Sequence, residues 1–197
     1  KQKDGWIEVI TGPMFAGKTE ELIRRIKRLE YAKKNIIVFK PVIDNRYADN
    51  EVVSHNNNRT KSVNISSGKE IFQHVKSDTD VVAVDEVQFL EPETVDILNY
   101  LADQGKRVIV SGLDTDFRGE PFSFMPKLIA IAEFVTKLTA VCVKCSAPAT
   151  RTQRIVNGKP AKYMDPIVLI GASESYEARC RSCHKVYRKP TKYKGSL

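Results

Sequence analysis

The chain has 197 residues, of which 42 % are apolar and 28 % charged, enough to bury a core as one domain or as one domain with a small appendage. It carries no apolar run of transmembrane length and no signal-peptide pattern, so we expect a cytoplasmic protein with no membrane partner. The net charge of +8 is concentrated at the C-terminus: seven of the 32 basic residues lie from Arg179 onward, where no acidic residue occurs. The remainder, with 25 basic and 24 acidic residues, is nearly neutral. We therefore expect no nucleic-acid partner and interpret residues 189–197 as a solvated basic tail.

The first motif is a phosphate-binding loop. Residues 12–19 read Gly-x-x-x-x-Gly-Lys-Thr, between an apolar run and a helical pattern, which is the strand–loop–helix context of a P-loop. Gly12 and Gly17 allow the main chain to approach a polyphosphate, and the N–H groups of the loop and helix start attract it. Lys18 is expected to contact the β- and γ-phosphates, and Thr19 to bind Mg²⁺. The expected ATP-binding residues of this loop are Gly12, Pro13, Met14, Phe15, Ala16, Gly17, Lys18 and Thr19.

A βαβ unit begins at this loop. The periodicity predicts a helix from about Thr19 to Lys34, whose arginines we expect to contact solvent or another subunit. The apolar run Ile36–Phe39 predicts a strand covered on both faces, hence a parallel sheet. Residues 40–61 are expected to form a long functional loop, followed by a short strand at Val63–Ile65 and a short helix at Glu70–Lys76.

The second motif is an acidic pair at the end of an apolar run. Val81–Val84 predicts a buried strand, and Asp85 and Glu86 follow it directly. Ligands of open α/β sheets bind at the carboxyl ends of the strands, and P-loop enzymes place a Mg²⁺-binding Asp there. Taken alone, such a pair equally well precedes a helix. The upstream P-loop favours Asp85 as a magnesium ligand and Glu86 as a general base.

The next part of the chain continues the alternation of strands and helices. The predicted elements are a helix at Pro92–Gln104, a strand at Arg107–Val110, a loop at Thr115–Phe124, a helix at Met125–Phe134 and a strand at Leu138–Val141. Together they predict an α/β fold over residues 1–141: a doubly wound, mostly parallel sheet of about five strands.

Two C-x-x-C pairs then change the character of the chain. Cys142, Cys145, Cys180 and Cys183 have the spacing of two zinc knuckles, and four thiolates would form a closed, structural Zn²⁺ site. His184 could replace Cys183 as the fourth ligand. We expect residues 142–188 to form a small zinc-binding domain whose inserted segment acts as a lid.

The order of these motifs resembles the thymidine kinase family, in its tetrameric, zinc-containing class. The resemblance is carried by Gly12–Thr19, Asp85–Phe89, Leu138–Cys142 with the paired cysteines, and Glu174–Tyr176. It covers nearly the whole chain. The family has a doubly wound P-loop domain and a small zinc domain with a lasso loop. Ala16 stands where many relatives have serine, and Leu90 where an aromatic residue is common.

The resemblance implies transfer of the γ-phosphoryl group of ATP to the 5′-hydroxyl of thymidine, with Mg²⁺ and a structural Zn²⁺ bound. It implies a homotetramer and feedback inhibition by dTTP. Glu86 would accept the hydroxyl proton. Asp44, Arg46 and Gln88 would complete the phosphate side of the site.

For the nucleoside, the resemblance implies a pocket with aromatic walls at Phe89 and Phe117. Met14 and Thr152 would lie near the base. The main chain of the lasso loop would hold thymine, with Tyr176 near the sugar. The lasso residues expected to do this are Ile167, Val168, Leu169, Ile170 and Gly171.

Two other functions fit parts of the pattern. A P-loop ATPase would use the acidic pair to activate water. A zinc-ribbon protein that binds nucleic acid would use the basic tail. The nearly neutral body and the absence of room for a second motor domain argue against both.

Overall fold

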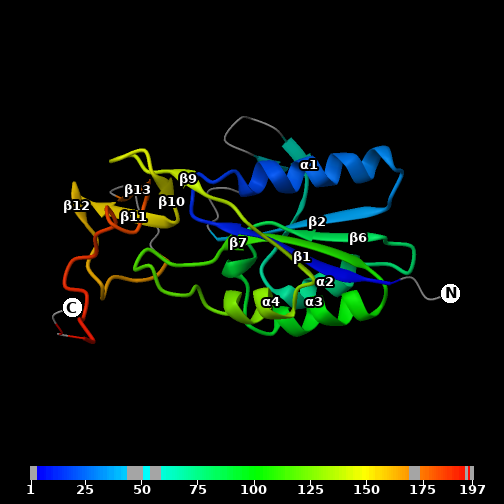
Figure 1. Cartoon of the computed structure of the whole chain (residues 1–197). Coiled ribbons are helices and arrows are strands. Elements are labelled where there is room, and N and C mark those ends of the chain that lie inside the picture. The colour runs from blue at the N-terminus through cyan, green and yellow to red at the C-terminus, as the bar shows by residue number, and fades with distance from the viewer. Residues whose placement is uncertain (1–3, 44–50, 54–58, 169–173, 194, 196–197) are drawn as a thin grey trace.

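The computed structural model describes residues 4–43, 51–53, 59–168, 174–193 and 195, and its centre is a parallel sheet of six strands in the order β5-β2-β6-β7-β1-β8 (Figure 1). The strands are β1 (Trp6–Gly12), β2 (Ile36–Pro41), β5 (Val63–Ile65), β6 (Val81–Val84), β7 (Arg107–Leu113) and β8 (Phe134–Lys137). This confirms the predicted α/β class, with one strand more than expected. No helix in the described ranges is long and apolar enough to cross a bilayer.

The register brings the two sequence motifs to one edge of the sheet. Gly12 at the end of β1 pairs with Leu113 at the end of β7, and Val84 at the end of β6 pairs with Val110 of β7. In parallel strands all carboxyl ends lie at the same edge. The loop after β1 and the acidic pair after β6 therefore face each other.

Helices cover both faces of the sheet, as a doubly wound fold requires (Figure 1). α1 (Lys18–Tyr31) lies on one face, where Leu22, Ile23 and Ile26 are buried against strand residues. The opposite face is covered by α2 (Ile71–His74), α3 (Thr94–Asp103) and α4 (Met125–Ile131). The apolar residues of α1 and α3 recur at helical spacing, so each helix buries its apolar face and exposes its polar face.

A smaller antiparallel region lies at one end of the sheet (Figure 1). β9 (Ala140–Val141) pairs with β10 (Pro148–Ala149), and β11 (Arg151–Val156) lies between β12 (Lys159–Pro160) and β13 (Glu174–Arg179). The remaining short elements are β3 (Glu51–Val53), β4 (Arg59–Lys61), η2 (Gly68–Glu70) and η3 (Val87–Phe89).

Several predicted boundaries differ from the structure. α4 ends at Ile131, and the next strand of the main sheet is Phe134–Lys137. Of the predicted strand Leu138–Val141, only Ala140–Val141 is a strand, and it lies outside the main sheet. β8 is an edge strand whose residues are largely exposed, so it lacks the buried apolar run that identified the inner strands. Residues 40–61 also contain the strands β3 and β4, which pair with each other.

Glu8, near the N-terminal end of β1, is the centre of a buried ion cluster. Its carboxylate accepts from Arg107 Nε at 2.5 Å, from Arg25 Nη1 at 2.9 Å and from the Trp6 indole at 2.7 Å. Arg25, predicted to face solvent or another subunit, instead lies in this cluster. Burial alone would raise the pKa of Glu8, but the hydrogen bonds and charge of its partners lower it below its usual value.

We expect Glu8→Gln to destabilise the protein by about 2–4 kcal/mol at pH 7, because two arginines lose a buried anionic partner. The folded-state pKa of Glu8 lies below the unfolded value of about 4.3, so its stabilisation is present above that value and is lost as pH falls through the folded-state pKa. Urea denaturation at a series of pH values measures this. The exposed Glu30→Gln is the control; a loss no larger than that of Glu30→Gln, or one that does not shrink on acidification, contradicts the role of the cluster.

Candidate active site and zinc centre

The loop between β1 and α1 has the strained backbone that its glycines allow. Gly12 has a φ of 138° and Gly17 a φ of 84°. A Cβ on Gly12 would lie 2.4 Å from the Leu138 carbonyl oxygen, so no other residue fits there without movement. Lys18 Nζ donates to the Pro13 carbonyl at 2.6 Å, across the mouth of the loop. The lysine is thus held where a phosphate in the loop would meet it.

The acidic pair lies directly opposite this loop. Thr19 Oγ1 donates to the Asp85 carboxylate at 3.3 Å, which joins the start of α1 to the end of β6. Asp85 also accepts from the Ser111 hydroxyl and, at 3.0 Å, from the Glu86 N–H. Glu86 has a φ of 50°, an uncommon left-handed conformation for a non-glycine residue. With this turn, the consecutive residues Asp85 and Glu86 both line one cavity.

Burial raises the pKa values of both carboxyl groups. For Asp85, desolvation outweighs the hydrogen bonds from Ser111 and the Glu86 N–H, which favour the charged form. For Glu86, desolvation and then the charge of Asp85 raise the pKa to about 7. Lys18 shows the opposite effect: burial lowers its pKa to about 8, although nearby carboxylates, Asp85 first, favour its charged form. The site therefore brings Lys18, Asp85 and Glu86 together in a buried space. A bound polyphosphate and its cation would change the protonation equilibria of all three side chains.

One cavity of about 280 Å³ connects the loop, the acidic pair and the C-terminal region. Its lining includes fourteen of the residues singled out in the sequence: Met14, Phe15, Gly17, Lys18, Thr19, Asp85, Glu86, Gln88, Phe89, Phe117, Thr152, Ile167, Val168 and Tyr176. Gly12, Pro13 and Ala16 belong to the same loop but do not line the cavity. Asp44, Arg46, Leu169, Ile170 and Gly171 lie outside the described residues.

Phe89, Phe117 and Phe122 form an aromatic wall of the cavity. The rings of Phe89 and Phe122 meet edge to face, with centroids 5.9 Å apart. Buried Phe117 lies in the loop after β7. Thr152 Oγ1, on β11, accepts from the Met14 N–H at 3.1 Å and so joins the C-terminal region to the phosphate-binding loop. A flat, mostly apolar ligand with a few polar atoms suits such a space.

Sequence analysis missed the most deeply buried cation of this wall. Arg154 lines the cavity from β11, only 1 % exposed, and its guanidinium carbon lies 4.0 Å from the centroid of the Phe117 ring. The available signal was strand alternation: Arg154 is two residues after Thr152 and therefore on the same face of the strand. Glu174 also lines the cavity and was not identified.

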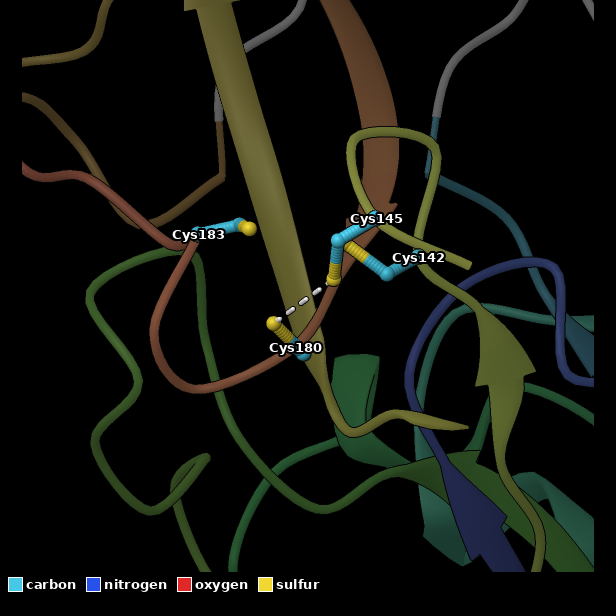
Figure 2. Close-up of side chains that lie close together, drawn as sticks. All are labelled: Cys142, Cys145, Cys180 and Cys183. Carbon is cyan, nitrogen blue, oxygen red and sulfur yellow. Dashed lines mark hydrogen bonds between the residues drawn. The ribbon is translucent and has the colours of Figure 1, made fainter. Parts of the chain in front are cut away.

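The four cysteines form a compact cluster in the C-terminal region (Figure 2). Their sulfur atoms all lie within 4.8 Å of one another, and the Cys145 and Cys180 sulfurs are 3.6 Å apart. Tetrahedral Zn–S bonds of about 2.3 Å require sulfur separations of about 3.8 Å. Both pairs form the same turn: the Ser146 N–H donates to the Cys142 carbonyl and the His184 N–H to the Cys180 carbonyl. The residues therefore fit a structural Zn²⁺.

His184 is not the fourth ligand in this arrangement. Its Nε2 lies 2.7 Å from the Phe117 carbonyl oxygen, so its ring is turned toward the aromatic wall of the cavity. The cluster is formed by the cysteines, Cys183 included. His184 thus connects the second knuckle to the loop that carries Phe117.

In a comparison with models of protein families, the model described as thymidine kinase matches residues 5–184. The matched range contains the phosphate-binding loop, the acidic pair and all four cysteines. It covers far more than half of the chain. Neither the hydrolytic ATPase nor the nucleic-acid-binding interpretation predicts this match.

We expect purified protein to carry about one zinc ion per chain and Cys145→Ser to lose it, because three thiolates leave the site open. Loss of the metal should lower the melting temperature by about 10 °C, since it removes several kcal/mol of stability. Metal analysis and thermal melting measure both effects. Ser182→Ala, at an exposed position between the second pair of cysteines, is the matched control. Unchanged zinc content in Cys145→Ser would refute the proposed ligand set.

Proposed function

The chain belongs to the thymidine kinase family and is a thymidine kinase, using ATP to phosphorylate thymidine; from that premise we propose that the reaction takes place in the cavity between the phosphate-binding loop and the C-terminal region. The observation that carries the proposal is the position of Glu86. Glu86 lines the same cavity as Lys18, Thr19 and the aromatic wall.

The triphosphate of ATP binds along residues 12–19 in this proposal. The main-chain N–H groups of the loop and the N-terminus of α1 attract the phosphates. Lys18 leaves the Pro13 carbonyl to contact the β- and γ-phosphates. Thr19 and Asp85, already 3.3 Å apart, would hold Mg²⁺, which neutralises charge on the phosphate oxygens when bound. Gln88 is buried beside this end, where its Oε1 accepts from the Leu113 N–H at 3.3 Å; we propose Asp44 and Arg46 for the same end from the family resemblance.

Thymidine binds at the other end, with its 5′-hydroxyl toward Glu86. The hydroxyl oxygen forms a bond to the γ-phosphorus, the bond from that phosphorus to the bridging oxygen of ADP breaks, and the hydroxyl proton passes to Glu86. A pKa near 7 suits this role, because a general base works best when its pKa lies near the pH of the reaction. Most of the catalysis is then positioning and charge neutralisation.

The thymine ring lies against Phe89 and Phe117 in this proposal, with Met14 and Thr152 near the base and Tyr176 near the sugar. Ile167 and Val168 line the cavity from the segment between the two cysteine pairs. Main-chain groups from Ile167 to Gly171 would hydrogen-bond the polar edge of thymine. Such recognition rejects cytosine, because a mismatched edge leaves buried polar groups without partners.

Two further properties are proposed from the family resemblance: inhibition by dTTP and a homotetramer. A cytoplasmic location and a division into units 1–141, 142–188 and 189–197 are proposed from the sequence patterns described above. The exposed apolar residues Phe134 and Val135 on β8, an edge strand of the main sheet, support a contact with another chain.

We expect Glu86→Gln to lower kcat by about 10²–10⁴, the contribution of a general base. The amide keeps the size of the side chain but accepts no proton, so binding of an ATP analogue should change little. Steady-state kinetics with ATP and thymidine, together with calorimetric titration of the analogue, measures both.

Glu93→Gln serves as the matched control, because Glu93 is exposed at the start of α3. Its kcat should equal that of the unmodified enzyme. If Glu86→Gln kept kcat within about tenfold, Glu86 would not be the general base.

We expect dTTP to inhibit competitively with thymidine, because its base would take the nucleoside end while its phosphates extend into the loop. Initial rates at varied thymidine and fixed dTTP test this: the apparent KM for thymidine should rise and kcat should stay constant. The control dCTP carries the same triphosphate on the wrong base and should inhibit much less. Equal inhibition by both nucleotides would show that the base is not recognised.

A further inference from the structure

Arg154 is buried beside the proposed nucleoside end, where the ligand itself carries no charge. Only 1 % of the residue is exposed. A guanidinium stays protonated at any physiological pH, and burying a charge is costly unless hydrogen bonds compensate for it. No carboxylate among the described residues forms an ion pair with Arg154. Its direct hydrogen-bond partners are therefore neutral groups.

Three of these groups accept its hydrogen bonds. Arg154 Nη1 donates to the Pro166 carbonyl and Nη2 to the neighbouring Ile167 carbonyl, while Nε donates to the Tyr176 hydroxyl at 3.2 Å. The planar fork of arginine matches two acceptors side by side. One side chain therefore holds the segment that leads into the proposed lid.

The Tyr176 hydroxyl connects Arg154 to a carboxylate by a second hydrogen bond. It donates to Glu174 Oε2 at 3.3 Å, so a carboxylate compensates the buried charge through the tyrosine. Tyr176 and Glu174 both lie on β13, which pairs with β11 over Arg151–Val156. The arginine and its tyrosine partner are thus anchored on neighbouring strands of one small sheet.

The flat face of the same guanidinium lies against the ring of Phe117 in the aromatic wall. Its central carbon is 4.0 Å from the centroid of Phe117, a geometry in which the cation attracts the ring. Phe117 belongs to the loop after β7, and His184 contacts its carbonyl oxygen from outside the cavity. Phe117 is therefore held on two sides, by Arg154 and by the residue after the fourth cysteine.

We propose that Arg154 is a positioning residue for thymidine, which fixes the separation between Phe117 and the Pro166–Ile167 segment and so sets the width of the nucleoside end. This rests on the proposal that thymidine binds there. The arginine acts through its contacts with Phe117 and with the Pro166–Ile167 segment. None of these contacts involves the phosphate-binding loop. Lysine keeps the charge but lacks the fork and the stacking plane, so it replaces only part of the function.

The test is the kinetics of Arg154→Gln and Arg154→Lys. We expect Arg154→Gln to lower kcat/KM for thymidine by about 10–100-fold, mainly through KM, since loosely held walls no longer orient the nucleoside. Arg154→Lys should lie between this variant and the unmodified enzyme. The KM for ATP should change by less than about threefold in both variants, because the ATP end has separate supports.

Arg188→Gln, at an exposed site in the same region, is the control for loss of a positive charge. Zinc content and melting temperature are measured for every variant. A thymidine KM within about twofold of the unmodified enzyme in both variants would overturn the proposal, and so would an equal rise in both KM values. If Arg154→Gln does not fold, the proposal is tested by Arg154→Lys alone, whose KM should rise for thymidine but not for ATP.

The result is distinguishable from failure of the proposed site. If Glu86→Gln loses activity as expected while the Arg154 variants keep their thymidine KM, the site stands and the positioning role is wrong. If Glu86→Gln remains active, Glu86 is not the general base, and the thymidine KM of the Arg154 variants still decides the positioning role.

Discussion

The contact on which the candidate active site depends is the hydrogen bond between Thr19 and Asp85, across the carboxyl edge of the sheet. A buried carboxylate is unfavourable by itself, and here the hydroxyls of Thr19 and Ser111 and the Glu86 N–H stabilise it. These partners come from α1, β7 and the turn after β6, so the parallel order of the strands is what brings them together. The fold thus places negative charge where a bound Mg²⁺ would neutralise it.

The C-terminal region completes the cavity that the sheet begins. Thr152 accepts from the Met14 N–H of the phosphate-binding loop, and His184 reaches the Phe117 carbonyl in the loop after β7. The cysteine cluster holds together the two segments from which these residues come. A structural Zn²⁺ can therefore affect nucleoside binding without any contact with the nucleoside, because it fixes the walls on which Arg154 and Tyr176 lie.

The inner strands and the two motifs could be predicted because they have local signals. β6 is a continuous buried apolar run, and Lys18 and Asp85 occupy fixed offsets from strand ends. β8 could not be predicted in the same way, since an exposed edge strand has no such run. Arg154 was missed for a different reason: its partners are carbonyl groups and a ring far along the chain, and a lone arginine on a strand indicates none of them. The roles of the site residues remain proposals.

The most direct test of the account is a crystal structure with a non-hydrolysable ATP analogue and thymidine bound together. We predict that the γ-phosphate lies against Lys18 and Thr19, and that the thymidine 5′-oxygen lies within hydrogen-bonding distance of Glu86, about 3 Å. Thymidine bound outside this cavity, or bound with its 5′-oxygen turned away from Glu86, would contradict the account.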